Sequence, residues 1–267
     1  MAYELVDALG RHVRFDRPPT RVVSLIPSIT ESLFELGLES SVQGVSKYCI
    51  YPAGLTDGKR KVGGQKNPDF QAIEEINPDL IILNREENKP DHIRKLGEKY
   101  PIWVTYPRQF LDTLALLRDL GGIFGVSVDD YQSEIRAGVE ALHLEAAQRC
   151  RVLYLIWRNP WMSINGDTFI HDVLKLHGLD NVFAEHPERY FEVSVDEIIS
   201  KNPEMIILPD EPYRFLKKHI AEFGDLPIQA VASGRVFLAD GTYFCWYGTR
   251  SARTSSYIRK QILARIK

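Results

Sequence analysis

Long apolar runs are absent from this chain. Nowhere in its 267 residues do about 18 consecutive apolar residues occur, the length that a membrane-spanning helix needs. The first residues, MAYELVDALGRHVRF, also lack the basic and then apolar layout of a secretory signal. As written, the sequence therefore indicates a cytoplasmic protein with no membrane span. A periplasmic or lipid-anchored location is the alternative if a signal has been removed.

Cysteine is scarce, and a strong charge of either sign is absent. The three cysteines, Cys49, Cys150 and Cys245, are odd in number and scattered, so no disulfide framework is predicted. This usage fits a reducing compartment, although many exported proteins of this size also lack disulfides. The net charge of −3 gives no reason to expect nucleic acid or an anionic membrane as a partner.

Familiar catalytic and cofactor motifs are absent as well. The chain contains no GxSxG elbow, no P-loop and no HExxH. The glycine pairs at 63–64 and 121–122 do not follow strands in a dinucleotide-binding frame. His171 and His177 lie six residues apart, so they point to different faces of a helix and make a poor metal pair. We therefore predict no cofactor, no metal site and no enzyme.

What the chain does contain is a duplication. IEEINPDLIIL (73–83) and DEIISKNPEMIIL (196–208) each read as a short amphipathic helix, an Asn-Pro-acid turn and a buried apolar run. RVVSLI (21–26) and RVLYLI (151–156) form a second matched pair upstream. The period of about 125 residues exceeds the roughly 20–50 of solenoid repeats, which indicates a duplicated unit. Two like lobes that face each other form a cleft, and clefts between domains are favoured ligand sites.

Alternating strands and helices predict an α/β fold with parallel sheets. A hairpin is expected over 3–16, and a helix of roughly 30 Å over 127–149 falls between the two copies. We predict an N-terminal α/β lobe over 1–109, a lobe-closing helix and a long inter-lobe helix over 110–149, and a C-terminal α/β lobe over 150–267. The expected strands are 21–26, 42–45, 80–83, 102–104, 152–156, 181–183, 205–208 and 235–238. Further helices are expected over 110–124, 168–177, 194–200, 213–223 and 250–266.

Polar and aromatic residues crowd the loops after these strands, where open α/β sheets bind ligands. Three of the four tryptophans lie there. Aromatic faces with a few directional polar groups suit a large, flat, partly apolar organic ligand. Loop aromatics can instead cover small satellite cores, but five enriched loops at one sheet edge favour a ligand cleft. Arg85 and Arg250 could bind a carboxylate or phosphate, or form surface ion pairs.

Four strings carry a family resemblance: RVVSLIPSITESLFELGL (21–38), GVSKYCIYP (44–52), VGG (62–64) and INPDLIIL (76–83). Together they resemble the vitamin B12- and iron-siderophore-type solute-binding proteins of ABC importers, over nearly the whole chain. The resemblance implies two Rossmann-like lobes with parallel sheets, joined by a long bridging α-helix, with ligand held in the cleft. In cobalamin-binding members, cleft aromatics and a late arginine hold the corrinoid. By position this implies Tyr48, Asn84, Trp157, Trp161, Tyr243, Phe244 and Arg250.

Two departures from the family pattern bear on transport. Importer-docking members offer one surface glutamate per lobe to arginines of the permease, and here Gln71 and Cys245 stand at those places. Glu74 or Glu75 could substitute on the same helix face. Together with the missing signal, these departures give reason to doubt docking to an ABC permease. They favour a cytoplasmic relative that has kept the cleft and lost the transporter.

The leading hypothesis is a monomeric, non-catalytic protein that binds a corrinoid, tetrapyrrole or metal chelate by aromatic stacking, with arginines pairing acidic groups of the ligand. One rival is an exported importer receptor whose signal was trimmed. The other is a chelatase-like enzyme that uses Asp167, His171, Asp172, Asp210 and Glu211 for acid–base or metal chemistry. A metal site that combines His171 with Asp172, Asp210 or Glu185 is a minority alternative. The predicted ligand-binding residues are Tyr48, Asn84, Arg85, Trp157, Arg158, Trp161, Tyr243, Phe244, Trp246, Tyr247 and Arg250.

Overall fold

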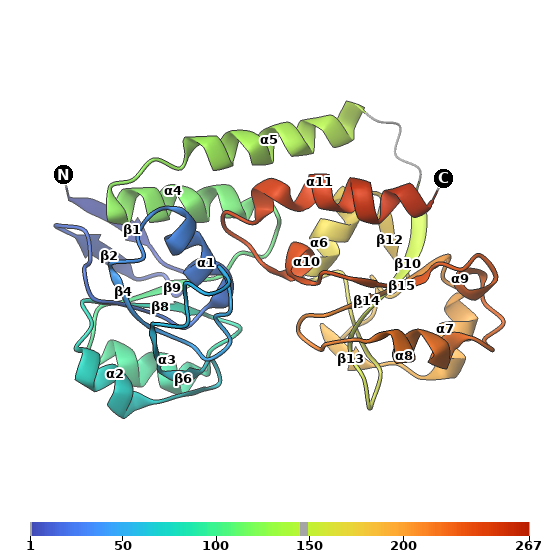
Figure 1. Ribbon diagram of the computed structural model, residues 1–267, viewed down its shortest axis with the longest axis horizontal. Helices are drawn as coiled ribbons and strands as arrows, with labels where there is room; N and C mark the ends of the chain where they lie inside the picture. The colour runs from blue at the N-terminus through green and yellow to red at the C-terminus, as the bar shows by residue number, and fades with distance from the viewer. Residues whose placement is uncertain (1, 145–148, 267) are drawn as a thin grey trace. The chain divides into compact units, whose positions relative to one another are not determined.

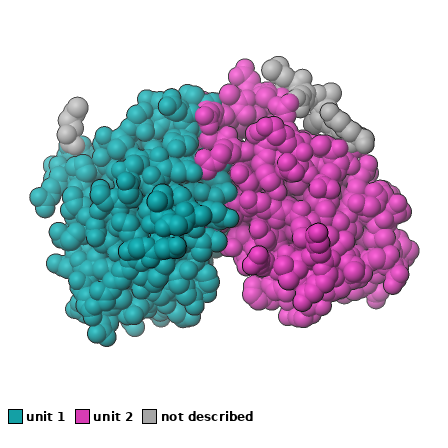
Figure 2. All heavy atoms as spheres, viewed as in Figure 1, with its two compact units in different colours: residues 1–107, 111–133, 247–250 teal, residues 108–110, 134–246, 251–267 magenta. Residues whose placement is uncertain are grey.

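The chain forms two compact α/β units, coloured separately in Figure 2. The computed structural model describes residues 2–144 and 149–266. Unit 1 comprises residues 1–107, 111–133 and 247–250, and unit 2 comprises residues 108–110, 134–246 and 251–267. A short late segment, 247–250, thus belongs to the unit that is otherwise built from the first half of the chain. The lobe boundaries expected from the sequence stay predictions.

Unit 1 contains a parallel five-stranded sheet, in which the predicted strands are confirmed (Figure 1). Its central strands are mostly apolar and fully buried, as expected for a parallel sheet covered on both faces. The predicted N-terminal hairpin is also present. The sheet order is β5 (Arg60–Lys61), β4 (Val42–Val45), β3 (Val22–Ser24), β8 (Leu80–Asn84) and β9 (Ile102–Thr105). The other elements are β1 (Tyr3–Val6), β2 (His12–Phe15), β6 (Gly63–Gly64), β7 (Asn67–Pro68), α1 (Pro27–Glu35), α2 (Phe70–Ile76), α3 (Pro90–Gly97) and α4 (Asp112–Phe124).

Unit 2 contains a parallel sheet that an antiparallel pair of short strands extends at one side. The sequence predicted the parallel strands but not the antiparallel pair. The sheet order is β13 (Tyr190–Glu192), β11 (Met162–Ile164), β10 (Cys150–Trp157), β14 (Met205–Pro209) and β15 (Val236–Ala239), with β12 (Leu179–Asn181) also paired to β10. The helices are α6 (Phe169–Leu176), α7 (Val195–Lys201), α8 (Lys217–Ile220), α9 (Gln229–Ala232), α10 (Thr242–Cys245) and α11 (Ser251–Gln261), with 3₁₀ turns η1 (Ala221–Phe223) and η2 (Leu263–Arg265).

Several predicted boundaries in unit 2 were wrong. The strand expected over 181–183 is β12, which ends at Asn181. The helix expected over 213–223 starts only at Lys217, because Leu216 is extended (φ −130°) and Phe215 packs into the core. The helix expected over 250–266 divides into α11 and η2.

The long helix is α5 (Asp129–Leu144), and the two units divide the chain within it, after residue 133. The part of the prediction that reaches over 145–148 lies outside the described residues. No helix in the described ranges combines the length and apolar character that crossing a membrane requires.

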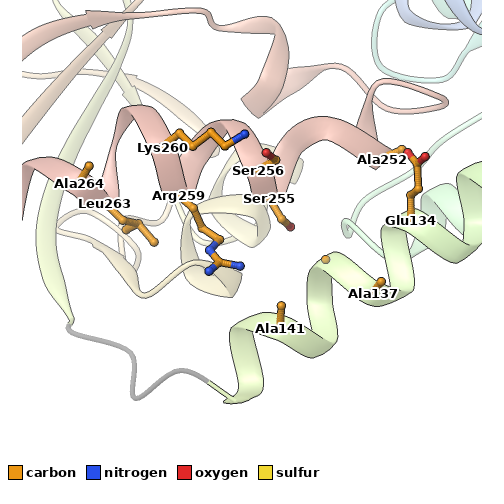
Figure 3. A pocket seen from close by; sticks show the side chains of 11 residues that line it. Glu134, Ala137, Ala141, Ala252, Ser255, Ser256, Arg259, Lys260, Leu263 and Ala264 are labelled. Atoms are coloured by element: carbon orange, nitrogen blue, oxygen red, sulfur yellow. The ribbon is translucent and has the colours of Figure 1, made fainter.

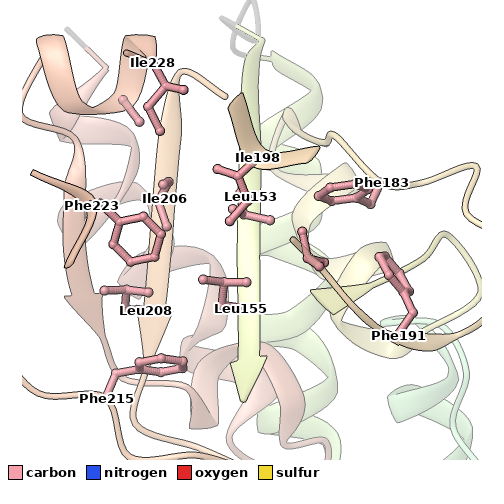
Figure 4. Close-up of a cluster of buried hydrophobic side chains, with 12 residues drawn as sticks. Leu153, Leu155, Phe183, Phe191, Ile198, Ile206, Leu208, Phe215, Phe223 and Ile228 are labelled. Atoms are coloured by element: carbon pink, nitrogen blue, oxygen red, sulfur yellow. The ribbon is translucent and has the colours of Figure 1, made fainter. Parts of the chain in front are cut away.

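One cluster of buried hydrophobic side chains in unit 2 lies on one face of its sheet (Figure 4). Leu153 and Leu155 on β10 and Ile206 and Leu208 on β14 point to this face, as the two-residue period of a strand requires. Aromatic rings from the loops and short helices cover these aliphatic side chains, and Trp161 packs against the same cluster. The rings are those of Phe183, Phe191, Phe215 and Phe223.

The duplicated Asn-Pro-acid turn makes the same pair of hydrogen bonds to an arginine in both units, and we call this arrangement the clasp. In unit 1 the carboxylate of Asp79 accepts a hydrogen bond from the Arg21 backbone N–H (2.7 Å), and the Arg21 side chain donates to the Asn77 carbonyl (2.9 Å). In unit 2 the carboxylate of Glu204 accepts from the Arg151 N–H (2.7 Å), and the Arg151 side chain donates to the Asn202 carbonyl (3.2 Å). The repeat therefore fixes how a helix end meets the start of the central strand.

Each clasp also depends on a left-handed asparagine at the end of the preceding helix. Asn77 has φ 50° and Asn202 has φ 43°. We expect Asn77→Ala to lower the free energy of unfolding by about 1 kcal/mol, because a Cβ without a polar group is disfavoured in this conformation. Asn77→Gly, the matched control, should stay within a few tenths of a kcal/mol of the wild type. Urea unfolding measures both, and equal stability of the two variants would contradict the explanation.

Candidate functional site

The carboxyl end of β10 in unit 2 presents an exposed aromatic surface. Trp157 is 44% exposed, and its ring meets that of Tyr213 edge-on with centroids 5.2 Å apart. Arg158 forms an ion pair with Glu222 (Nε–Oε2 2.8 Å). Trp161 instead stacks on Phe215, with an interplanar angle of 10°, and packs into the core. Of the two tryptophans in this loop, Trp157 is therefore the one whose ring offers area to a ligand.

The loops after β14 and β15 add polar groups and one more accessible ring. Tyr243 is half-buried and stacks on Tyr257 with centroids 4.1 Å apart. Asp210 accepts a hydrogen bond from the Gly241 N–H (2.8 Å). Burial and then the negative charge of Asp210 raise the pKa of the neighbouring Glu211. This edge therefore offers a carboxyl group that holds its proton to a higher pH than an ordinary glutamate does.

Two other predicted residues of this loop are buried within unit 2. Phe244 has no exposed surface and packs against Tyr154, with ring centroids 5.2 Å apart. Trp246 is 6% exposed. The short helix α10, which the sequence did not predict, holds Phe244 in this position. In this structure the Phe244 ring belongs to the interior of the unit, and the Trp246 side chain is almost fully covered.

At the carboxyl edge of the sheet in unit 1, the predicted residue Tyr48 is 53% exposed. Its ring lies over the backbone of Gly64, where an added Cβ would be 3.0 Å from Tyr48 Cε2. The Lys47 ammonium lies 5.0 Å from the ring centroid. Arg85, directly after β8, is exposed and lies over the Tyr106 ring (5.4 Å). This edge thus carries an aromatic face and two cations.

Asn84 and Tyr247 form a buried polar network in unit 1. The Asn84 amide donates to the Tyr247 hydroxyl (2.9 Å), which in turn donates to Glu87 Oε1 (3.1 Å). The Asn84 side-chain oxygen accepts hydrogen bonds from the N–H groups of Glu86 and Glu87. Both predicted ligand residues therefore hold the loop after β8 in place. Glu87, which sequence reasoning missed, completes the network.

Arg250 is also buried in unit 1, where it forms an ion pair with Glu31 of α1. Its Nε donates to Glu31 Oε2 (2.8 Å), and Nη2 bonds the other carboxylate oxygen. The guanidinium carbon lies 4.9 Å from the Tyr51 ring centroid. Arginine and glutamate are 6% and 3% exposed. Glu31 was not among the predicted residues, because no sequence pattern relates it to Arg250.

Two of the residues named by the enzyme hypothesis, Asp167 and Asp172, make structural contacts within unit 2. Thr168 caps α6, accepting a hydrogen bond from the His171 N–H, whereas Asp167 forms an ion pair with Arg108. Asp172 accepts a hydrogen bond from the Phe110 N–H (2.7 Å). Burial lowers the pKa of His171. Within residues 2–144 and 149–266, no three His, Cys, Asp or Glu side chains are arranged to hold a metal.

The two positions that replace docking glutamates lie on helices. Gln71 is exposed on α2 and donates to Glu75 (3.2 Å), which also forms an ion pair with Arg60. Glu74 on the same helix pairs with Lys99 (3.4 Å). Cys245 is half-buried at the end of α10. The face of α2 is therefore acidic in composition but already paired with basic side chains.

A groove of about 780 Å³ lies in unit 2 between α5 and α11 (Figure 3). It is lined mostly by small side chains, among them Ala137, Ala141, Ala252 and Ser256. The two helices come close at Gly138, where an added Cβ would be 3.2 Å from Ser255. None of the predicted ligand residues lines this groove. In each unit, the candidate ligand contacts therefore lie at the carboxyl ends of the strands and in the loops that follow them.

Comparison with known proteins identifies the class. The family described as periplasmic binding protein matches residues 22–243, and the chain belongs to this family. A vitamin B12-binding protein of Vibrio cholerae is 23% identical over 242 residues, which cover 89% of this chain and 86% of that protein. The resemblance expected from the sequence is thereby confirmed.

Solved structures establish the fold. The periplasmic vitamin B12-binding protein of Vibrio cholerae superposes with a TM-score of 0.79 at 20% identity, covering 94% of this chain and 99% of that one. A periplasmic heme-binding protein from Roseiflexus sp. RS-1 gives 0.76 at 20% identity, with 92% and 99% covered. A catecholate-siderophore-binding protein of Vibrio cholerae gives 0.79 at 17% identity, with 99% and 100% covered. The predicted fold class, two α/β lobes with parallel sheets and a bridging helix, is confirmed.

Proposed function

We propose that this protein is a solute-binding protein that captures a corrinoid, tetrapyrrole or metal-chelate ligand without chemical change. Family membership supports the binding role, since relatives with the same fold are named for vitamin B12, heme and a catecholate siderophore. These ligands share a broad ring or chelate face with polar groups around it. A surface that binds them needs accessible aromatic faces and a few directed polar groups.

The observation that carries the proposal is the exposure of Trp157. An indole that is 44% exposed, at the last position of the central strand β10 and supported by Tyr213, offers a flat apolar surface at the carboxyl end of the sheet, where open α/β sheets bind ligands. Packing against Tyr213 limits the rotation of the indole, so less side-chain entropy is lost on binding. We propose that Trp157, Tyr243 and Tyr48 stack against the ligand.

Arg158 completes the proposed contact set in unit 2. Its guanidinium is half-buried beside the tryptophan loop and forms an ion pair with Glu222. This ion pair holds the arginine in a defined position while leaving other N–H donors of the guanidinium for an acidic group of the ligand. The buried residues of the predicted set then act indirectly, by holding the ligand-contacting loops. These are Asn84, Phe244, Trp246, Tyr247 and Arg250, and the partly buried Trp161 acts in the same way.

Trp157→Leu is expected to weaken ligand binding about tenfold, because one aromatic stacking contact of about 1.4 kcal/mol corresponds to that factor. Absorbance titrations with cobalamin, cobinamide and haem measure the effect. Tyr100→Leu is the matched control, since this partly exposed tyrosine lies just before β9, at the amino end of the sheet. Its affinity should match that of the wild type. If none of the three compounds binds, the ligand class is wrong; if Trp157→Leu binds normally, the surface is wrong.

Membership of a periplasmic family supports a second candidate, a receptor that delivers its ligand to an ABC importer. Gln71 and Cys245 count against this candidate, because they stand where importer-docking relatives are expected to carry glutamates. Glu74 and Glu75 are the residues that could serve in their place. The codons that precede this sequence in the complete gene give a direct test. A secretory signal there would favour the importer receptor, and its absence would favour a cytoplasmic binding protein.

A further inference from the structure

Unit 1 contains a second hollow, which Arg85 lines but which none of the residues proposed to contact the solute (Trp157, Arg158, Tyr243 and Tyr48) lines. It is a groove of about 570 Å³ beside α3, within the roughly 300–1,000 Å³ of small-molecule sites. The turn of the β1–β2 hairpin forms one side of it, and α3 forms the other. The lining residues are Leu9, Arg11, Arg85, Pro90, Ile93, Arg94, Gly97 and Glu98. We propose that this groove binds a small amphiphilic carboxylate, one acidic head on an apolar body.

Apolar atoms form most of the groove surface. Leu9 is 44% exposed at the tip of the hairpin, and Pro90 and Ile93 face it from the first turns of α3. Gly97 keeps the far end open: an added Cβ would lie 2.8 Å from Ile102 and 3.5 Å from the Arg11 guanidinium. An apolar chain that enters the groove would cover the exposed part of Leu9, at about 25 cal/mol per Å² of apolar surface removed from water.

Of the three arginines that line the groove, two form ion pairs with carboxylates. Arg11 pairs with the buried carboxylate of Asp7, and Arg94 pairs with Glu98 (2.7 Å). Arg85 lies over the Tyr106 ring, and among the described residues its guanidinium has no ion-pair partner. One unpaired guanidinium at the mouth of an apolar groove is complementary to a single carboxylate, which it can bind through two parallel hydrogen bonds.

Decanoate is the test ligand, used below its micelle-forming concentration and measured by calorimetric titration. The wild type should bind decanoate at least tenfold more tightly than decanol, which has the same chain without the charge. Arg85→Gln should remove that preference, and Leu9→Ser should weaken decanoate and decanol alike. Both substituted side chains are exposed, so folding is not at risk. Arg17→Gln is the matched control, because Arg17 is an exposed arginine of the same unit that does not line the groove.

Three results would overturn the proposal: no binding of decanoate by the wild type, equal affinity for decanol, or unchanged affinity in Arg85→Gln. Repeating the titration with saturating cobinamide or haem separates this site from the solute site. Decanoate affinity should not change in their presence, and competition would mean that decanoate occupies the solute site. Failure of cobinamide and haem to bind would contradict the proposed function and leave the groove unaffected.

Discussion

Replacing Arg250 by methionine is expected to lower the stability of unit 1 by about 3–5 kcal/mol, because the Glu31 carboxylate would remain buried without its partner. Both side chains are almost fully excluded from solvent and joined by two hydrogen bonds. The segment around Arg250 has further contacts with α1. The Thr249 N–H donates to the Ser32 hydroxyl (3.1 Å), and Gly248 passes so close that an added Cβ would be 2.1 Å from the same oxygen. Loss of the ion pair would therefore loosen the whole segment.

Urea unfolding measures this loss, and hydrogen exchange of the β3 and β8 amides assigns it to unit 1. The double variant Glu31→Leu, Arg250→Met should be more stable than Arg250→Met alone, because neither charge is then left unpaired. Arg94→Met is the matched control. It breaks the exposed pair with Glu98, which should cost at most about 1 kcal/mol. Equal losses for Arg250→Met and Arg94→Met would contradict the importance given to burial.

The second large effect is a loss of stability in acid that depends on His177. This imidazole is 3% exposed, and burial lowers its pKa from 6.5 to about 4, although a hydrogen bond to the Val173 carbonyl opposes the shift. Nε2 lies 3.2 Å from the Ser255 hydroxyl of α11. The folded protein thus keeps His177 neutral, whereas the unfolded chain takes up a proton near pH 6.5. Stability is complete above that pH and falls as the pH drops towards 4.

At about 1.36 kcal/mol per pKa unit, the loss between pH 6.5 and 4 amounts to about 3 kcal/mol. Urea unfolding at pH 7 and at pH 4.5 measures most of it. His177→Gln cannot take up the proton, so its stability should change less between these two values than that of the wild type. His12→Gln is the control, because His12 is exposed on the hairpin. A His177→Gln slope equal to the wild-type slope would show that other groups govern the acid loss.

Much of the fold could be predicted from the sequence because its signals are local. Apolar runs such as 80–83 and 205–208 read as strands within a few residues, and the Asn-Pro-acid turn repeats within each unit. The antiparallel strands β11 and β13 were missed because three residues are too few to show a period. The early part of the helix expected over 213–223 was wrong because tertiary packing of Phe215 overrode helix propensity.

The candidate site was harder to predict because loop position does not reveal burial. Trp157 and Trp161 are only four residues apart, at the end of β10 and in the turn that follows, yet only the Trp157 ring is largely exposed. Tyr247 and Arg250 follow a strand, as ligand residues do, but their partners Glu87 and Glu31 lie 160 and 219 residues earlier. Such pairings depend on the completed fold, so no spacing rule could have found them.

The position of residues 247–250 in unit 1 also constrains the order in which the protein can fold during synthesis. Ribosomes release the chain from its N-terminus, and a unit made of contiguous residues can fold as soon as it emerges. Here Glu31 and Asn84 can form their hydrogen bonds only after Arg250 and Tyr247 have been synthesised. Arg250 and Tyr247 are added close to the end of translation. A nascent chain that stalls after the first half should therefore hold unit 1 unfinished, with a buried carboxylate that has no counter-ion.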